Sequence, residues 1–276
     1  MKQREQFENG VLSVRFVGAQ LNQHGVSIYD LGESLLAIQR IVHKAFLAEQ
    51  GRLVKGAYPS KEEREELALQ LGERRRQSDA FALVPILSDP AVQMVLLKLM
   101  DYIASGLIGY FVGDVVERIR KEPDANKKIF IASIFKEVEG IAVRVGTAGG
   151  VESVVLGSPA MDRETLATFN GDTKNYLAEI KNENFLGGYE EIRGRVYKFY
   201  PNSNIVGIRR AGGKTVTVFL NERDFEVIRY LKEKNPLFLF KGHPVYKLGA
   251  ETKSVTEFDA DEIERVYEED PLDDLV

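Results

Sequence analysis

Nine basic and aromatic side chains lie within 22 residues of this sequence, and they are its strongest indication of chemistry. Side chains alternate between the two faces of a strand, so we expect Arg195 and Tyr197 on one face and Lys198 on the other. Cations that follow phosphates and rings that stack on bases are typical of surfaces that bind single-stranded nucleic acid. The cluster comprises Arg193, Arg195, Tyr197, Lys198, Phe199, Tyr200, Arg209, Arg210 and Lys214.

The elements around this cluster predict a small closed sheet. Gly187-Gly188 marks a boundary, after which the sequence becomes rich in strands. Three strands, a helix and two more strands are the order of a five-stranded OB barrel, and an SH3-like barrel is the close rival. We expect the barrel to span residues 187–266 and an acidic tail to span 267–276. The strands are expected at 191–200, 205–210, 215–220, 237–240 and 254–258, with a further piece at 245–248, and the helix at 222–234.

The predicted ligand surface combines this fold with the basic cluster. In OB barrels, the loops after the first and fourth strands flank the ligand, and here they would be residues 201–204 and 242–252. A merely solvated outer face would show the same residue types, so both interpretations stay open. If the ligand is nucleic acid or a nucleotide-like anion, we expect it to contact Arg195, Tyr197, Arg209, Arg210, Lys214 and Tyr246.

Residues 1–186 predict an α+β domain with the order β-α-β-β-α. Alternation indicates a strand at 11–17, and Ser27 with Asp30 begins a helix that ends before Gly51. Its buried stripe is expected to comprise Ile28, Leu31, Leu35, Ile38, Val42 and Ala45. Strands are then expected at 67–72, 80–86, 151–156 and 165–169, and helices at 90–121, 126–138 (or, if it is longer, 126–145) and 172–181.

The helix expected at 90–121 is apolar almost all round, which is also typical of a membrane span. Lys98, Asp101 and Asp114 oppose that assignment, because each charge is costly at the centre of a bilayer. Lys98, Asp101 and the small residues Ser105, Gly109 and Gly113 fall on one face, where another backbone could approach closely. We expect a core helix, packed within the domain or in a homo-oligomer; a membrane-acting effector is the alternative.

No motif in this sequence indicates catalysis, a metal or a cofactor. Cysteine is absent, which excludes disulfides and thiolate chemistry. Arg74-Arg75-Arg76 is expected on an exposed turn, where it could contact phosphate or simply be solvated. The segment 146–150 is rich in glycine but lacks the ending of a phosphate-binding loop, so we expect a turn. His43 is expected to be partly buried beside the apolar stripe, without a nucleophile nearby.

The net charge of −5 is unevenly distributed. Residues 259–276 contain nine acidic residues and one basic residue, which leaves a charge of +3 on the rest of the chain. A mildly basic body is compatible with an anionic partner. The polar N-terminus shows no apolar signal segment, and together with the missing cysteines this favours the cytoplasm.

Two segments resemble an uncharacterised bacterial family: residues 28–32 together with 38–44, and residues 240–258. Members of that family pair an N-terminal α+β region with a C-terminal five-stranded β-barrel, and some are found near anti-phage defence genes. The resemblance implies this architecture over most of the chain and implies no catalytic residue.

These observations favour a non-enzymatic binding or assembly protein whose barrel binds an anionic ligand. The alternatives are a protein-interaction subunit of a bacterial complex, such as an anti-phage defence complex, without nucleic-acid binding, and the membrane-acting effector. An enzyme whose site is assembled between the domains is not excluded, although no spacing of residues indicates one.

Overall fold

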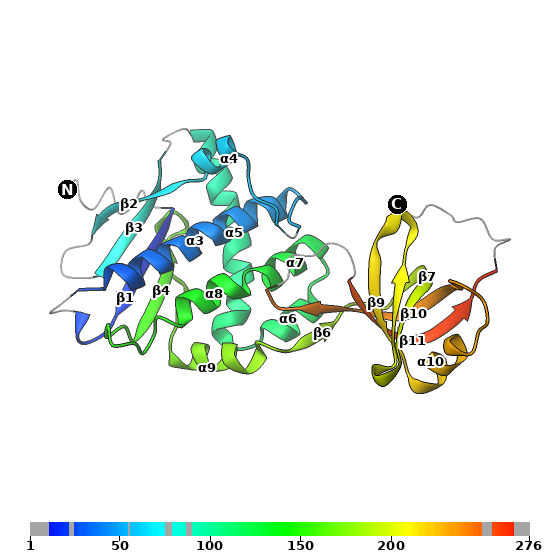
Figure 1. Ribbon diagram of the computed structural model, residues 1–276. Coiled ribbons are helices and arrows are strands. Elements are labelled where there is room, and N and C mark those ends of the chain that lie inside the picture. Colours follow the sequence, from blue (N-terminus) through cyan, green and yellow to red (C-terminus); the bar gives the residue numbers. More distant parts are fainter. Residues whose placement is uncertain are drawn as a thin grey trace. The chain divides into compact units, whose positions relative to one another are not determined.

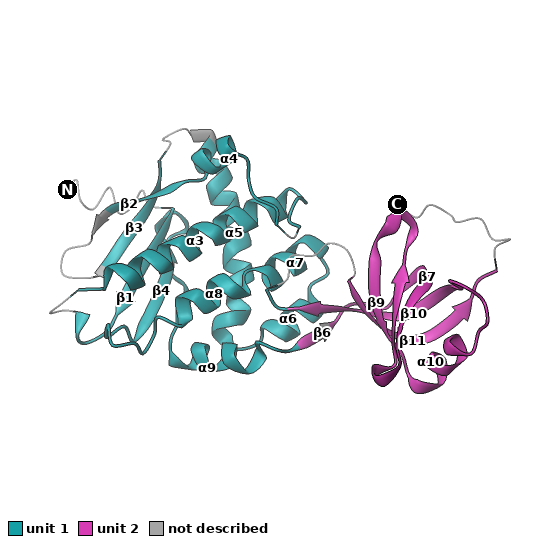
Figure 2. Cartoon of the chain, viewed as in Figure 1, with its two compact units in different colours: residues 1–183, 248–253 teal, residues 184–247, 254–276 magenta. Residues whose placement is uncertain are grey.

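The computed structural model describes residues 11–21, 25–54, 56–74, 79–86, 90–249 and 256–267 (Figure 1). The fold is α+β, and the chain forms two compact units (Figure 2). The first unit comprises residues 1–183 and 248–253, and the second comprises residues 184–247 and 254–276.

The first unit contains a five-stranded antiparallel sheet in the order β2-β3-β1-β4-β5. Its central strand alternates as expected, with Leu12, Val14 and Phe16 buried. A strand with one buried face is fixed in register, because a slip by one residue would expose that face. The strands are β1 (Leu12–Val17), β2 (Leu69–Arg74), β3 (Asp79–Pro85), β4 (Ser153–Ser158) and β5 (Arg163–Phe169).

Helix α3 (Ile28–Glu49) begins and ends where its capping residues predict. Ser27 Oγ accepts a hydrogen bond from the Asp30 amide at 3.0 Å, and Gly51 adopts a φ of 65° after the last turn. The predicted buried stripe is partly wrong, since Ile28 is 91% exposed and Leu31 and Leu35 are only half-buried. Ile38, Val42 and Ala45 of the predicted stripe are buried, and the packed face also includes Ser34, Ala37 and Ile41.

The single helix predicted at 90–121 is wrong, because the structure has two helices there, α5 (Pro90–Val112) and α6 (Val115–Lys121). Gly113 breaks the helix with a φ of 80°, a left-handed conformation that glycine adopts without steric cost. The chain then turns so that α6 packs on α5. A Cβ atom at Gly109 would lie only 2.8 Å from the Cα of Val115.

The remaining helices of this unit differ from the predictions mainly at their ends. The single helix expected from 126 to 138, or to 145, is two helices that meet at Ile134, and a short helix, α4, forms in a charged segment for which we expected no helix. Ser60 and Glu63 make a reciprocal capping box that starts α4. Helices α3 and α8 lie side by side (Figure 1). The bounds are α4 (Lys61–Glu66), α7 (Ala125–Ser133), α8 (Phe135–Ala142) and α9 (Gly171–Ile180).

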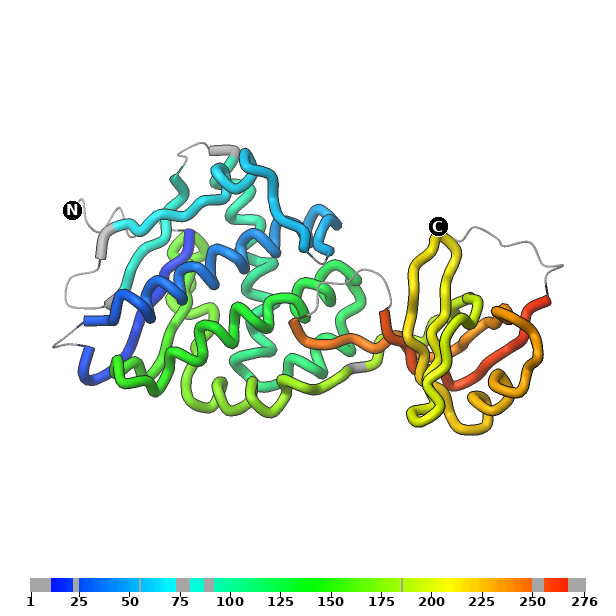
Figure 3. Tube along the Cα trace, in the orientation of Figure 1, coloured from blue at the N-terminus to red at the C-terminus, as the bar shows by residue number. Residues whose placement is uncertain are grey.

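The second unit is a sheet whose five main strands close in a ring, in the order β11-β9-β8-β7-β10 and back to β11. Strands β9 and β11 pair in parallel, and the other neighbours are antiparallel. Figure 3 follows these strands around the ring, and β6 adds a short edge on β10. The elements are β6 (Asn184–Leu186), β7 (Glu190–Tyr200), β8 (Ile205–Arg209), β9 (Thr215–Phe219), α10 (Glu222–Arg229), β10 (Leu237–Lys247) and β11 (Glu257–Arg265).

The last two strands were predicted with the wrong bounds. The pieces expected at 237–240 and 245–248 form one strand, β10, so the predicted loop 242–252 begins inside a strand. Residues 254 and 255 of the strand expected at 254–258 lie outside the described residues; the strand is described from Glu257 and continues past residue 258 through the acidic segment to Arg265. Buried Phe258 and Ala260 alternate with carboxylates, some of which pair with β10, as Glu264 does with Lys241 at 3.2 Å. Of the predicted tail 267–276, only Tyr267 lies within the described residues.

Candidate ligand-binding surface

The outward face of β7, β8 and β9 holds most of the basic and aromatic cluster. Val196, Val206 and Ile208 fill the interior of the ring, so the residues between them point outward. Arg195 of β7 lies opposite Arg209 of β8 in the register. We call this face, with the hairpin that joins β8 to β9, the β7–β9 surface.

Tyr197 occupies a bulge at the centre of this surface. The register between β7 and β8 shifts between Val196 and Lys198, which leaves Tyr197 as the extra residue. Its ring lies against Gly207, where a Cβ atom would come within 3.1 Å of the Tyr197 Cε1 atom. The guanidinium of Arg209 lies 5.3 Å from the ring centroid, within the range of a cation–π interaction.

A second cation–aromatic pair lies on the same face. The expectation that Lys198 points away from Tyr197 is wrong, because the bulge shifts the alternation and the Lys198 Cβ also borders Gly207. Lys198 Nζ lies 4.6 Å from the centroid of the Tyr200 ring, and this side chain raises the pKa of Lys198 above its ordinary value. Neither residue was among the expected ligand contacts, because sequence alternation cannot locate a bulge.

The β8–β9 hairpin adds two cations next to Arg209. The Arg210 amide donates to the Lys214 carbonyl at 2.8 Å, and Gly212 and Gly213 form the tip with positive φ. The ion pairs formed among the described residues of this unit involve other cations, and none involves Arg209, Arg210 or Lys214. Their charges are therefore not neutralised by a neighbouring described carboxylate, and the hairpin is positively charged.

Five of the six expected contacts gather on this surface, and Tyr246 does not. Arg195 pairs across the strands with Leu237 and donates a long hydrogen bond, 3.4 Å, to the carbonyl of Asn235. Tyr246 lies nine residues farther along β10, about 30 Å of extended chain from Leu237, where it pairs with β6. Burial, with a smaller effect of Glu190, raises the pKa of Tyr246.

The strand that borders the β7–β9 surface, β11, carries negative charge. Next to β9, the outward residues of β11 are Glu257, opposite Thr217, and Asp259, opposite Phe219. Glu257 accepts from Lys247 Nζ at 2.6 Å. An anion is therefore attracted to β7, β8 and the hairpin, and repelled by β11.

In the first unit, His43 is a structural residue. It is partly buried as expected, its Nε2 lies 3.0 Å from the Gln39 amide nitrogen, and burial, then Arg64, lowers its pKa. The Gln39 side chain also bonds the Leu67 carbonyl and the Leu69 amide, which joins α3 to the start of β2. This arrangement positions a strand and places no nucleophile beside the imidazole.

A buried ion pair that the sequence did not reveal joins α3 to α8. Lys44 Nζ lies 2.8 Å from a Glu137 carboxylate oxygen and also donates to the Ser133 carbonyl at 2.8 Å. Both side chains are largely removed from solvent. The two residues are 93 positions apart, and no local pattern links them.

The other features singled out in the sequence do not build a site. Arg75 and Arg76 lie outside the described residues, as does the side chain of Arg74. In segment 146–150, Gly149 and Gly150 pack closely against Asp30 and Gln20, so glycine is required there for close packing. Among the described residues, no group of three histidine, aspartate or glutamate side chains could hold a metal.

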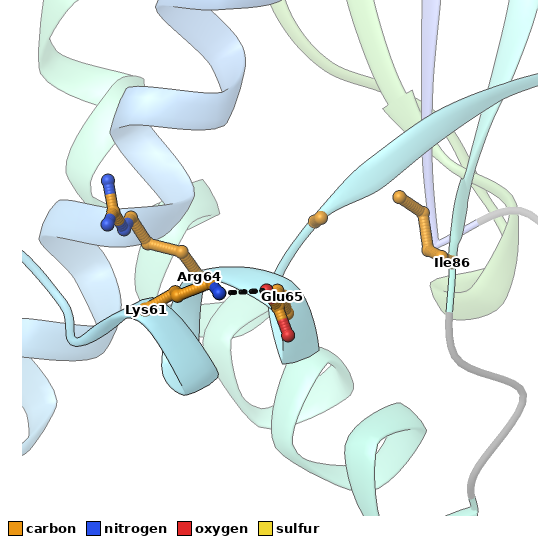
Figure 4. A pocket seen from close by; sticks show the side chains of 5 residues that line it. Lys61, Arg64, Glu65 and Ile86 are labelled. Carbon is orange, nitrogen blue, oxygen red and sulfur yellow. Dashed lines mark ion pairs between the residues drawn. The ribbon is translucent and has the colours of Figure 1, made fainter.

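A pocket of about 510 Å³ lies between α4 and the edge of the sheet where β2 begins and β3 ends (Figure 4). It is lined by Lys61, Arg64, Glu65, Ala68 and Ile86, and Lys61 pairs with Glu65 across its rim at 3.9 Å. The lining mixes both charges with apolar groups and contains no pair of an acid or base with a nucleophile. The arrangement suits no particular chemistry.

By length and composition alone, the segment Val92–Val112 of α5 is long enough and apolar enough to cross a membrane. Of the most apolar window of this helix, 44% is buried inside the protein. Gly106 and Gly109, whose small size could serve a partner helix, are already covered by Phe130 and by α6. The small residues of α5 are thus contacted closely by other parts of the same chain.

Comparison of the chain with known protein families, with curated proteins and with solved structures gives no match.

Proposed function

We propose that the second unit is an OB-type barrel that binds single-stranded nucleic acid on its β7–β9 surface, and that the protein is a binding or assembly protein rather than an enzyme. The observation that carries the proposal is the basic and aromatic face around Tyr197 and Arg209. The protein-interaction subunit remains the alternative outcome of the test below.

The order of the strands supports the OB assignment. Three antiparallel strands are followed by a helix and two strands, and the ring closes through a parallel pair between the third and fifth strands. A ring that followed the chain order would instead place the third strand beside the fourth. In OB folds, the face of the second and third strands binds oligonucleotides. Those strands here are β8 and β9, which form part of the surface that carries the cations.

The chemistry of the surface favours a single strand over a duplex. Tyr197 is 43% exposed and Tyr200 is 41% exposed, so both rings are accessible to a ligand. The bases of a single strand are free to stack on such rings, whereas the bases of a duplex already stack on one another. The cations of the hairpin supply contacts for phosphate.

The proposal predicts salt-dependent binding to a fluorescent thymidine oligonucleotide, measured by fluorescence anisotropy. The double substitution Arg209→Ala and Lys214→Ala should weaken binding at low salt by about tenfold or more. It should also reduce the slope of log K against log salt by about 1.4, which is about 0.7 for each lost phosphate contact. Both side chains are exposed, so folding should be retained.

The charge-matched control is Arg223→Ala with Arg229→Ala on α10, in the same unit. It should bind as the wild type does. Absence of oligonucleotide binding by the wild-type protein at low salt would refute the proposal. A stable protein complex formed without nucleic acid would then favour the protein-interaction subunit.

A further inference from the structure

We infer that the β7–β9 surface takes a chain of two or more nucleotides rather than a mononucleotide, because it offers two separate stacking platforms, Tyr197 and Tyr200. This inference rests on the proposed function and specifies its ligand. It adds Lys198, Tyr200 and Gly207 to the residues that the sequence suggested.

The first platform is positioned by its surroundings before any ligand binds. The inner side of the Tyr197 ring lies against the backbone of Gly207, and Arg209 lies 5.3 Å from the ring centroid. The absence of a side chain at Gly207 is what allows the ring to lie down on β8. A ring held in this way loses little conformational entropy when a base stacks on it.

The second platform is Tyr200, held by Lys198 at 4.6 Å. It lies three residues beyond Tyr197 on β7, and because Tyr197 is the extra residue of the bulge, the two positions are about two strand spacings, or about 7 Å, apart along the strand. Each base stacks on one ring, so a single base occupies one platform. Filling both platforms therefore requires two bases, which two linked nucleotides supply in one molecule.

The cations follow the same line as the rings. Lys198 lies between the two tyrosines in sequence, and Arg209 lies beside Tyr197. Arg210 and Lys214 extend the positive charge past Arg209 at the hairpin. A polynucleotide places a phosphate between successive bases and can use these cations in turn, whereas a mononucleotide can use one end of the line only.

Stacking on tyrosine depends little on which base is present, since every base has a π-face. The platforms are therefore expected to bind single strands with little preference for sequence. Affinity should depend instead on the number of linked nucleotides, up to the length that covers both rings and the hairpin.

The test measures binding of thymidine monophosphate and of thymidine oligonucleotides of two, four and eight residues to the full-length protein. The variants are Tyr200→Ala and Tyr200→Phe, and the control is Tyr230→Ala, an exposed tyrosine beside Arg229 elsewhere in the same unit. We expect affinity to rise from the monophosphate to the four-residue oligonucleotide. Tyr200→Ala should weaken eight-residue binding by about fivefold or more and monophosphate binding by about twofold at most, because one of the two rings remains for a single base.

Tyr200→Phe keeps the ring and should bind the eight-residue oligonucleotide nearly as the wild type does. Equal eight-residue affinity of Tyr200→Ala and the wild type would overturn the two-platform inference, and so would a monophosphate that binds as tightly as the eight-residue oligonucleotide. Either result would leave the proposed function standing. Failure of the wild type to bind any oligonucleotide would refute the proposed function itself.

Discussion

At the scale of single residues, Gly207 determines how Tyr197 is presented. Its neighbours Val206 and Ile208 are fully buried, so a side chain at position 207 would point outward, into the space that the tyrosine ring occupies. The bulge at Tyr197 and the glycine opposite it act together. The bulge turns the Tyr197 ring toward β8, and the missing side chain at Gly207 leaves room for the ring to lie on the sheet.

Replacing Gly207 with alanine should therefore weaken binding more than it weakens folding. The new Cβ would lie 3.1 Å from the ring, which is exposed and can move away. We expect eight-residue oligonucleotide affinity to fall by about threefold or more, while the free energy of unfolding changes by less than about 1 kcal/mol. Anisotropy and urea denaturation measure the two quantities.

Gly188→Ala is the control for that substitution, since a Cβ atom there has no neighbour within 4 Å. Should Gly207→Ala bind oligonucleotide as the wild type does, the position of the Tyr197 ring would have no part in binding.

At the scale of elements, two glycines organise the helices of the first unit. Gly113 ends α5 in a left-handed conformation, and Gly109 then allows α6 to pack against α5. The Asp114 amide donates to the Gly109 carbonyl at 2.9 Å, which closes the turn. The small residues of α5 suggested contact with a helix of another protein. At Gly109, the contact is instead made by α6 of the same chain.

Gly109→Ala should destabilise the protein by about 1–3 kcal/mol, because the added Cβ lies 2.8 Å from the backbone of Val115 and forces α6 outward. Gly140→Ala in α8 is the matched control. A Cβ there meets no atom within 4 Å, and alanine should stabilise the helix by about 0.5–1 kcal/mol.

Urea denaturation followed by circular dichroism measures both changes. An unchanged midpoint for Gly109→Ala would show that α6 does not depend on this close contact.

At the scale of the whole molecule, the second unit has a hydrophobic core of its own. The buried cluster around Val206, Phe238 and Phe258 draws all its members from residues 192–260. Phe258 belongs to β11, the strand that closes the ring, and it is fully buried. The acidic segment is thus partly structural, since its apolar residues complete the core.

Phe258→Ala should remove about 3–5 kcal/mol of stability from the second unit, by loss of buried surface and by the cavity left behind. We expect calorimetry to show one unfolding transition shifted to lower temperature, while the transition of the helical first unit is retained. Equal shifts of both transitions would show that the two units unfold as one.

The sequence by itself determined the features that depend on neighbouring residues. The N-cap at Ser27, the C-terminal glycine Gly51 and the alternation in β1 and β7 to β9 are local, so their elements appear close to the predicted positions. The same local patterns gathered the basic and aromatic residues onto adjacent strands. Composition also excluded thiol chemistry, because no cysteine is present.

Tertiary structure alone decided what depends on distant partners. The bulge that puts Tyr197 and Lys198 on one face requires β8 beside β7, and the course of β11 through the acidic residues requires its backbone pairing with β10 and with β9. The separation of Tyr246 from the arginines follows from a single long β10. Register between strands is set by contacts across the sheet, and a one-dimensional pattern does not contain them.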